Sequence, residues 1–115
     1  MAKYVDGFVL VVPKKNLKAY QKMANKGGDI WKKYGALEYF GCVGDDLNPT
    51  ITGFKVLGFP KIIKAKTNEA VVFSFIVFKS RKHRDQVNAK VMGDLSINDP
   101  TNQNQPMPFD MKKMA

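Results

Sequence analysis

Residues 70–78, AVVFSFIVF, restrict the fold more than any other segment, because they form a strand that is apolar on both faces. β-branched and aromatic side chains dominate the segment, as is typical of strands. Alternate residues of a strand point to opposite sides of the sheet. One face then carries Val71, Phe73, Phe75 and Val77, and the other carries Val72, Ile76 and Phe78. We therefore expect a sheet that is covered on both sides.

The other expected elements have recognisable ends. Proline cannot donate to a strand ladder, so Pro13 ends a strand, while Gly35 is suited to follow a helix and Ser80 to cap one. These ends define a strand over residues 4–12, a lysine-rich helix over 14–34, a strand over 36–43 and a helix from 80 to about 92. In the long connection over 47–68, FPKIIKA indicates a short strand or a turn of helix, and Pro108 can begin a last helical turn after a polar tail.

The order strand, helix, strand, strand, helix is that of a ferredoxin-like split βαβ unit. We predict an α+β fold with an antiparallel sheet, in a single domain over residues 1–115. Helices then cover only one face, so the second apolar face needs a cover from outside the chain. The commonest solution is a two-fold contact between copies. We expect Phe73, Phe75 and Val77 in such a dimer face, with more than about 1,000 Å² buried.

The chain has a formal net charge of +9, which attracts phosphate groups where basic residues cluster. In the helix over 14–34, a period of 3.6 residues separates the lysines from an opposite face made of Leu17, Tyr20, Ala24, Gly27, Trp31 and Tyr34. This pattern predicts a surface helix with a solvated lysine face. Gly27 and Gly28 each weaken a helix by roughly 1 kcal/mol relative to alanine, which predicts close packing or a local break there.

Cysteine content and hydropathy favour a cytoplasmic location. The single cysteine, Cys42, cannot form an intrachain disulfide, and the N-terminal residues lack the pattern of a signal peptide. No apolar run approaches the ~20 residues that span a bilayer, so no membrane segment is expected. Cys42 falls in mid-strand without basic neighbours in sequence, which favours a small apolar residue over a reactive thiol.

Five segments are spread along nearly the whole chain: KYVDGFVLVVPKKNLKAY, a tryptophan followed by GALEY, CVGDD, VVFSFIVFKSRKHRDQVNAKVM and MPFD. They resemble the YbaA-like bacterial family, domain of unknown function family 1428. The resemblance implies a dimeric α+β barrel, in which the open sheet face of one protomer packs on that of its partner. It implies no particular activity, because this fold includes cofactor-independent monooxygenases, isomerase-like enzymes and binding proteins.

The resemblance also bears on the number of strands. Family members continue after MPFD into a fourth strand, whereas this sequence stops at Ala115. We expect either a truncated chain or a sheet that lacks one strand. In both cases the strand over 4–12 would be an unprotected edge.

The sequence contains no glycine-rich phosphate loop, no nucleophile elbow and no dinucleotide fingerprint. One histidine and one cysteine cannot form a common closed zinc site, which leaves only a metal held by His83 and carboxylates. We expect no metal and no cofactor, and a pocket between sheet and helices that binds or converts a small organic molecule. If the protein is an enzyme, we expect oxygenase- or isomerase-like general acid–base chemistry.

The alternative is an RNA-recognition-like module that binds single-stranded nucleic acid. Phe73, Phe75, Ile76 and Phe78 match the aromatic skeleton of that signature, but two valines replace its basic residue and glycine. The two hypotheses compete for one surface. Phe73 and Phe75 stack on bases if the face is open, and pack on a partner if it is closed.

His83, the only histidine, is the candidate catalytic group. It is in line with apolar positions four and eight residues later, so its side chain is expected on the helix face that packs on the sheet. The predicted topology brings Asp6 and Glu38 to the same rim, with Trp31 and Tyr34 lining the pocket. A carboxylate there would fix the imidazole tautomer and allow general-base catalysis. The alternative is a histidine that merely hydrogen-bonds a carboxylate or carbonyl beneath its helix.

Overall fold

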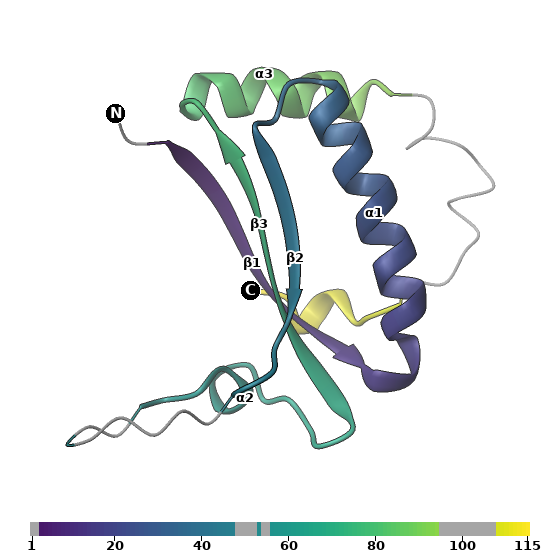
Figure 1. The fold of residues 1–115 in the computed structure, drawn as a ribbon, viewed down its shortest axis with the longest axis vertical. Helices are drawn as coiled ribbons and strands as arrows, with labels where there is room; N and C mark the ends of the chain where they lie inside the picture. Colours follow the sequence, from purple (N-terminus) through teal and green to yellow (C-terminus); the bar gives the residue numbers. More distant parts are fainter. Residues whose placement is uncertain (1–2, 48–52, 54–55, 95–107) are drawn as a thin grey trace.

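A computed structural model describes residues 3–47, 53, 56–94 and 108–115 of the chain. The fold is α+β, with three strands in one antiparallel sheet and helices packed against it (Figure 1). The strands are β1 (Tyr4–Pro13), β2 (Glu38–Val43) and β3 (Glu69–Phe78), and the helices are α1 (Leu17–Lys33), α2 (Phe59–Ile62) and α3 (Arg81–Met92). Short 3-10 turns, η1 (Lys14–Asn16) and η2 (Met111–Lys113), precede α1 and follow residue 110.

The strand that is apolar on both faces is the central one, since the strand order is β1-β3-β2. Tyr4 of β1 lies opposite Phe78, and Glu38 of β2 lies opposite Val77. The end of β3 therefore meets the beginnings of both neighbours, as the predicted topology requires. This rim is also where α3 begins.

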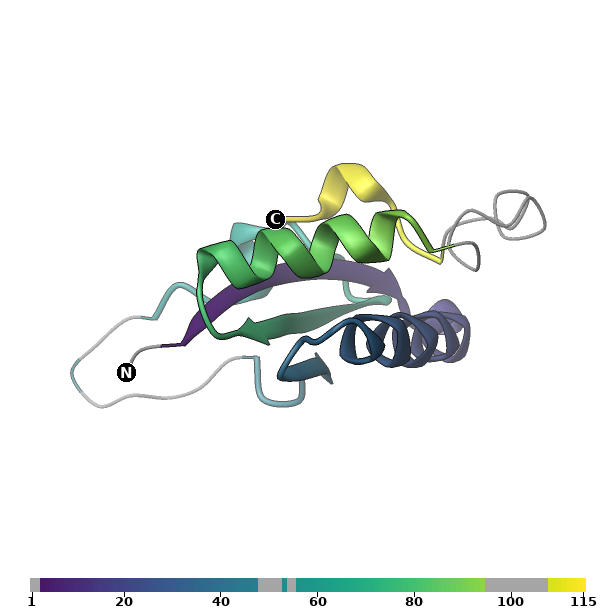
Figure 2. The ribbon, with the colours of Figure 1, turned by 90° about the horizontal axis from the view of Figure 1, so that it is seen from above.

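Both long helices pack on the same side of the sheet, which we call the helix face (Figures 1 and 2). Ile76 and Phe78 of β3 are buried there with Ile30 of α1 and with Val87 and Val91 of α3. A second buried cluster consists of Leu10, Val12, Tyr20, Val72 and Phe109. The predicted alternation of β3 is thereby confirmed. The second cluster also shows that the segment after residue 107 belongs to the core.

The predicted helix over 14–34 begins with the 3-10 turn η1, and α1 then runs without a break through its glycine pair. The glycines permit close packing, because a Cβ on Gly28 would stand 3.0 Å from Cδ1 of Tyr39. Of the two predictions for this pair, close packing is the one that is confirmed. The lysine face is exposed as expected, and Ile30 is a buried residue that the predicted face omitted.

The predicted helix ends are also confirmed. The Ser80 hydroxyl accepts a hydrogen bond from the His83 amide at 3.1 Å and so caps α3. Gly35 follows α1 with a φ of 115°, a left-handed value that glycine adopts without the strain a side chain would bring. FPKIIKA forms a turn of helix, α2, and not a strand.

The opposite side of the sheet, the open face, is mostly apolar. It comprises Val5, Gly7, Val9 and Val11 of β1, Val71, Phe73, Phe75 and Val77 of β3, and Glu38, Phe40 and Cys42 of β2. At one end Val11 and Val71 are buried, and α2 contributes Phe59, whose ring stacks on Phe73 with 6.4 Å between centroids. Elsewhere the face is exposed: Val5 is 50%, Phe40 43% and Phe73 41% accessible.

The last described segment returns to β1. The Asn16 side-chain amide donates to the Pro108 carbonyl at 3.0 Å, which holds this segment beside α1. Val9 and Ala115 exchange both of their backbone hydrogen bonds, at 2.8 and 2.9 Å, as directly opposed residues of antiparallel strands do. The expectation that β1 is an unprotected edge is therefore wrong at Val9.

Candidate functional site

A groove of about 650 Å³ lies between α1 and the edge strand β2. Its walls come from one side of α1 and from the helix-face side chains of β2. The lining residues are Leu17, Tyr20, Gln21, Ala24, Asn25, Gly28, Asp29 and Lys32 of α1, with Tyr39, Gly41 and Val43 of β2. It is larger than a second hollow of about 430 Å³ that includes Leu47 and Val71, and it lies between sheet and helix, although its lining differs from that of the predicted pocket.

Small residues create the hollow. Gly41 is the middle helix-face position of β2 and carries no side chain, so the space above it is open to α1. A Cβ at Gly41 would stand 3.5 Å from the Tyr20 hydroxyl and 4.0 Å from the Ala24 methyl. The Tyr20 hydroxyl thus reaches across the gap to the strand. Larger residues at Gly41 or Ala24 would fill the groove.

Two phenols, Tyr20 and Tyr39, line the groove, and the Ser74 hydroxyl lies within hydrogen-bonding reach of both. Ser74 is directly opposite Gly41 in the sheet, is buried, and donates from Oγ to the Phe40 carbonyl at 3.0 Å. Burial raises the pKa of Tyr20 and of Tyr39 above the ordinary phenol value, and the hydrogen-bonding influence of Ser74 opposes this only in part. Both phenols are therefore protonated throughout the physiological pH range and available as hydrogen-bond donors.

The end of the groove nearest the sheet rim carries charges of both signs. Asp29 and Lys32 line it, and Lys32 forms an exposed ion pair of 3.7 Å with Glu38. Glu38, one of the predicted site residues, therefore lies beside the groove through its partner Lys32. An exposed pair of this kind contributes little to stability, so Lys32 is free to exchange Glu38 for another anion.

The predicted catalytic residue, His83, has a structural environment in the first turn of α3. Its Nδ1 accepts a hydrogen bond from the Lys79 amide at 3.0 Å, and its ring meets Phe78 edge-on at 6.0 Å. Since Nδ1 is an acceptor, the neutral imidazole carries its proton on Nε2. The ring thus contacts the end of β3, and its Nε2 lies 3.5 Å from a Cβ built on Gly35. Among the described residues it has no hydrogen bond or ion pair with Asp6 or Glu38.

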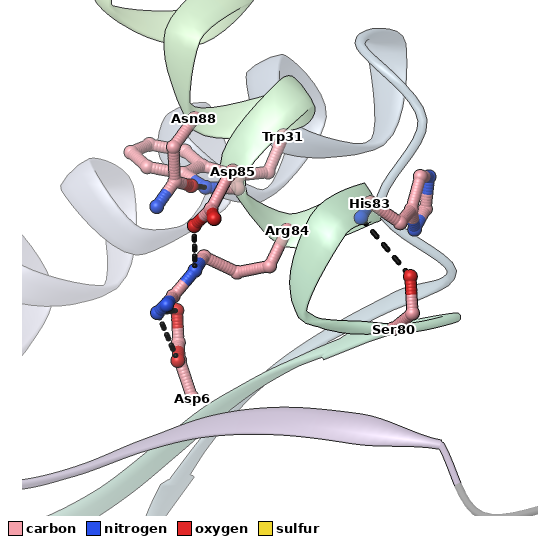
Figure 3. Close-up of polar contacts among 7 residues, drawn as sticks. All are labelled: Asp6, Trp31, Ser80, His83, Arg84, Asp85 and Asn88. Carbon is pink, nitrogen blue, oxygen red and sulfur yellow. Dashed lines mark hydrogen bonds and ion pairs between the residues drawn. The ribbon is translucent and has the colours of Figure 1, made fainter.

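The partner of Asp6 is Arg84, the residue after His83. The Arg84 guanidinium donates to both Asp6 carboxylate oxygens, and Figure 3 shows His83 and Arg84 leaving the first turn of α3 on different sides. Arg84 also donates from Nε to Asp85 at 2.7 Å and lies 5.1 Å from the centre of the Tyr4 ring. Hydrogen bonds to the two carboxylates raise the pKa of Arg84, which keeps the guanidinium charged.

Trp31 and Tyr34, predicted to line the pocket, lie near the end of α1 but outside the lining of the groove. The Trp31 indole donates to Asn88 of α3 at 3.2 Å (Figure 3). The Tyr34 hydroxyl donates to the buried carboxylate of Asp94, and this hydrogen bond raises the pKa of the phenol. Both side chains therefore join α1 to the α3 region.

The predicted dimer-face residues Phe73, Phe75 and Val77 all lie on the open face. The phenylalanines form a continuous row of rings, with centroid distances of 5.0 Å for Phe40–Phe75 and 5.5 Å for Phe73–Phe75. Phe59 extends the row beyond Phe73. The row lies over β3 and β2 and, among the described residues, leaves Gly7 of β1 uncovered.

Sequence reasoning missed the groove, although two signals were available. Gly41 interrupts a strand, which is typical of a bulge or of close approach by a ligand or another backbone. Ser74 is the one polar residue inside the apolar run of β3. Neither signal shows that Tyr20 lies beside Gly41 and Ser74, because this depends on how α1 packs on the sheet.

In the part of the chain that the structure describes, no three His, Cys, Asp or Glu side chains are grouped so that they could hold a metal ion. None of its helices combines the length and the apolar character that crossing a bilayer demands.

Comparison with known proteins places the chain in a family. Residues 3–111 match the family described as "Protein of unknown function (DUF1428)". Proteins named "Uncharacterized protein YbaA" from Escherichia coli K12, Escherichia coli O157:H7 and Shigella flexneri are each 40% identical to this chain over 112 residues, which span 97% of it and 90% of their own length. With a family match over nearly its whole length, the chain belongs to the DUF1428 family.

Proposed function

We propose that this protein is a cytoplasmic homodimer that binds or converts a small organic molecule in the groove between α1 and β2. Each protomer is a ferredoxin-like unit, and two open faces pack together as a dimeric α+β barrel. The proposal has two independent parts, the ligand and the dimer, and each rests on its own feature of the molecule.

The observation that carries the ligand part is that two protonated phenols, Tyr20 and Tyr39, line a groove whose walls mix small apolar residues with polar and charged ones. Ligand sites in proteins are typically concave and apolar, with a few polar groups that fix the orientation of the ligand. Two protonated phenols suit a carbonyl, carboxyl or hydroxyl oxygen. The volume of about 650 Å³ accommodates a molecule of metabolite size.

The dimer part rests on the open face. Exposed Val5, Phe40 and Phe73 belong to one apolar surface that the helices do not cover. Contiguous apolar patches on a protein surface commonly mark contact sites. Two copies of the chain can cover this surface for each other through a two-fold contact, which is the commonest arrangement in soluble oligomers.

The competing hypothesis for the open face is base stacking by single-stranded RNA on Phe73 and Phe75. The row of rings favours it, since stacked aromatic side chains are the usual platform for bases. The charges disfavour it, because the only charged residue among those that define the open face is Glu38. A phosphate backbone needs Lys or Arg beside the stacking platform.

The catalytic role of His83 with Asp6 or Glu38 stays a prediction. Arg84 holds Asp6, and the Lys79 amide occupies Nδ1 of His83, so Nε2 is the nitrogen left for chemistry. A test is the His83→Gln variant in any reaction that the groove is found to support. Loss of turnover with unchanged ligand affinity would support a catalytic role.

Ligand-observed and protein-observed NMR with a library of small carboxylic acids, ketones and phenols tests the ligand part. We expect hits that shift amides of α1 and β2, and that bind at least tenfold more weakly to Tyr20→Phe and Tyr39→Phe. Tyr34→Phe is the matched control, because its hydroxyl binds Asp94 outside the groove. Hits that shift other residues, or equal affinity in all variants, would refute the groove as the site.

Sedimentation velocity at micromolar concentration tests the dimer part. We expect a dimer that becomes monomeric in Phe73→Lys, because a buried lysine would have no partner on the apposed face. A wild-type monomer would contradict the proposal. A monomer that binds oligoribonucleotides through Phe73 would replace it with the RNA hypothesis.

A further inference from the structure

Gly7 lies in the interior of β1, and no contact within the described part of the protomer requires a glycine there. Glycine weakens a strand, so it is retained where φ is positive or where another group approaches closely. The positive-φ glycines among the described residues are Gly35 and Gly53, so Gly7 has an ordinary strand backbone. Among the described residues, no atom outside its chain neighbours lies within 4 Å of a Cβ built on Gly7. The described part of the isolated protomer therefore has room for a β-carbon there.

The usual compensation for a strand glycine is also missing. An aromatic side chain on the neighbouring strand can lie over a glycine and cover it. Phe75 is directly opposite Gly7, but its ring lies 5.0 Å from the Phe40 ring and 5.5 Å from the Phe73 ring, in the row over β3 and β2. The space above Gly7 stays empty.

The open face thus has a raised part and a lower part. One is a ridge, made of the rings of Phe40, Phe75 and Phe73. The other is a furrow along β1, made of Val5, Gly7 and Val9, with its lowest point at Gly7. A ridge beside a furrow allows a copy of the same surface, after a two-fold rotation about an axis parallel to the strands, to place its ridge over the furrow.

We infer that Gly7 is the socket of a two-fold interface, which receives an aromatic ring of the partner's ridge. The inference rests on the proposed homodimer and adds which strands meet: β1 of one copy lies against the β2–β3 side of the other. Nearly all charges lie off this face, so a second apolar surface suits it better than a polar or anionic partner. Phe40 and Phe73, the most exposed rings of the ridge, are the candidates for the socket.

The Gly7→Val variant tests the socket, because its expected effects on the protomer and on the dimer are opposite. Valine is a better strand residue than glycine, and the described part of the isolated protomer has room for its β-carbon, so it should leave the fold intact or more stable. In the socket it would collide with the partner's ring. We expect the dimer dissociation constant to rise at least tenfold in Gly7→Val and by less in Gly7→Ala, with an unchanged circular dichroism spectrum.

A second experiment keeps Gly7 and locates the partner directly. Phe40 or Phe73 is replaced by p-benzoylphenylalanine, and photo-cross-links are mapped by mass spectrometry in dimers mixed from ¹⁴N- and ¹⁵N-labelled protein. We expect at least one variant to give inter-copy cross-links to the β1 peptide that contains Gly7. Cross-links only to other strands, or a Gly7→Val protein that dimerises as tightly as wild type, would overturn the socket while leaving the dimer in place. A wild-type monomer would instead remove the proposed dimer and the socket with it.

Discussion

Arg84 of α3 binds Asp6 of β1 through both carboxylate oxygens, at 2.9 and 3.2 Å from Nη1. Both side chains are about four-fifths buried, with 21% and 20% of their surfaces exposed. A single nitrogen contacts both oxygens, and such charge-assisted hydrogen bonds are stronger than neutral ones, so the pair helps to fix how α3 sits across the first strand. Asp6, which was predicted to take part in catalysis at this rim, is therefore occupied by a structural ion pair with Arg84.

The pair should show coupling in a double-mutant cycle. We expect Arg84→Met to lower the melting temperature, because it leaves the largely buried Asp6 carboxylate without its counter-charge, and Asp6→Asn to lower it less, because Arg84 keeps its ion pair with the exposed Asp85. The double variant should lose less than the two losses added together. Thermal unfolding of all four proteins measures this, and simple additivity would show that the contact has no energetic weight.

Gly28→Ala should destabilise the protein, although alanine ordinarily stabilises a helix by about 1 kcal/mol relative to glycine. The new Cβ would stand 3.0 Å from the Tyr39 ring, which is held between α1 and β2. Overpacking of this kind costs about 1–3 kcal/mol. Urea unfolding measures the change, and Asn25→Ala on the exposed side of the same helix is the control, for which we expect a small gain.

Alkaline pH should unfold the protein by ionising its buried tyrosines. Burial raises the pKa of Tyr20 and of Tyr39 above the ordinary value of about 10 that each has in the unfolded chain. Stability from the neutral phenols is therefore complete below pH 10 and is lost as pH rises toward the folded-state values. Absorbance at 295 nm should show late ionisation whose amplitude falls in Tyr20→Phe and in Tyr39→Phe, while Tyr34, whose pKa is raised by its hydrogen bond to Asp94, still ionises late in both. Ser74→Ala should delay the ionisation of Tyr20 and Tyr39 further. Ionisation of all tyrosines near pH 10 in the folded protein would contradict this.

Phe109→Ala should cost about 3 kcal/mol or more, as truncation of a buried phenylalanine generally does. The Phe109 ring is 9% exposed and meets Tyr20 edge-on at 6.0 Å, beside Leu10 and Val72. Chemical denaturation measures the loss. The neighbouring Asp110→Ala is a suitable control, since Asp110 is exposed and a loss of similar size there would indicate general disruption of the segment.

Much of the fold could be predicted from the sequence because its determinants are local. Alternation along 70–78 identified both faces of β3, Ser80 and Gly35 marked helix ends, and the order of elements placed β3 between its neighbours. Each of these signals lies within a few residues of the feature that it predicts. The fourth-strand question also gave a specific place to look, the outer edge of β1.

The site was harder to predict because it depends on how elements are rotated against one another. His83 and Arg84 are adjacent on α3 and point about 100° apart, so a small rotation of the helix decides which of them reaches Asp6. The groove depends on side chains that are missing or small in two separate elements, Gly41 in β2 and Ala24 in α1. Such a hollow has no signature along the chain.

The strand order also has a consequence for how the chain is made. Of the three described strands, β3 is the last to leave the ribosome, yet it supplies the hydrogen-bonding partner of both β1 and β2. Until Phe78 has been synthesised, the apolar segments FVLVV and YFGCV have no native partner and remain exposed in the nascent chain. Such late, long-range pairing slows folding and leaves unpaired strands open to misassociation. Holding these two segments apart on the ribosome is therefore a condition for a good yield of folded protein.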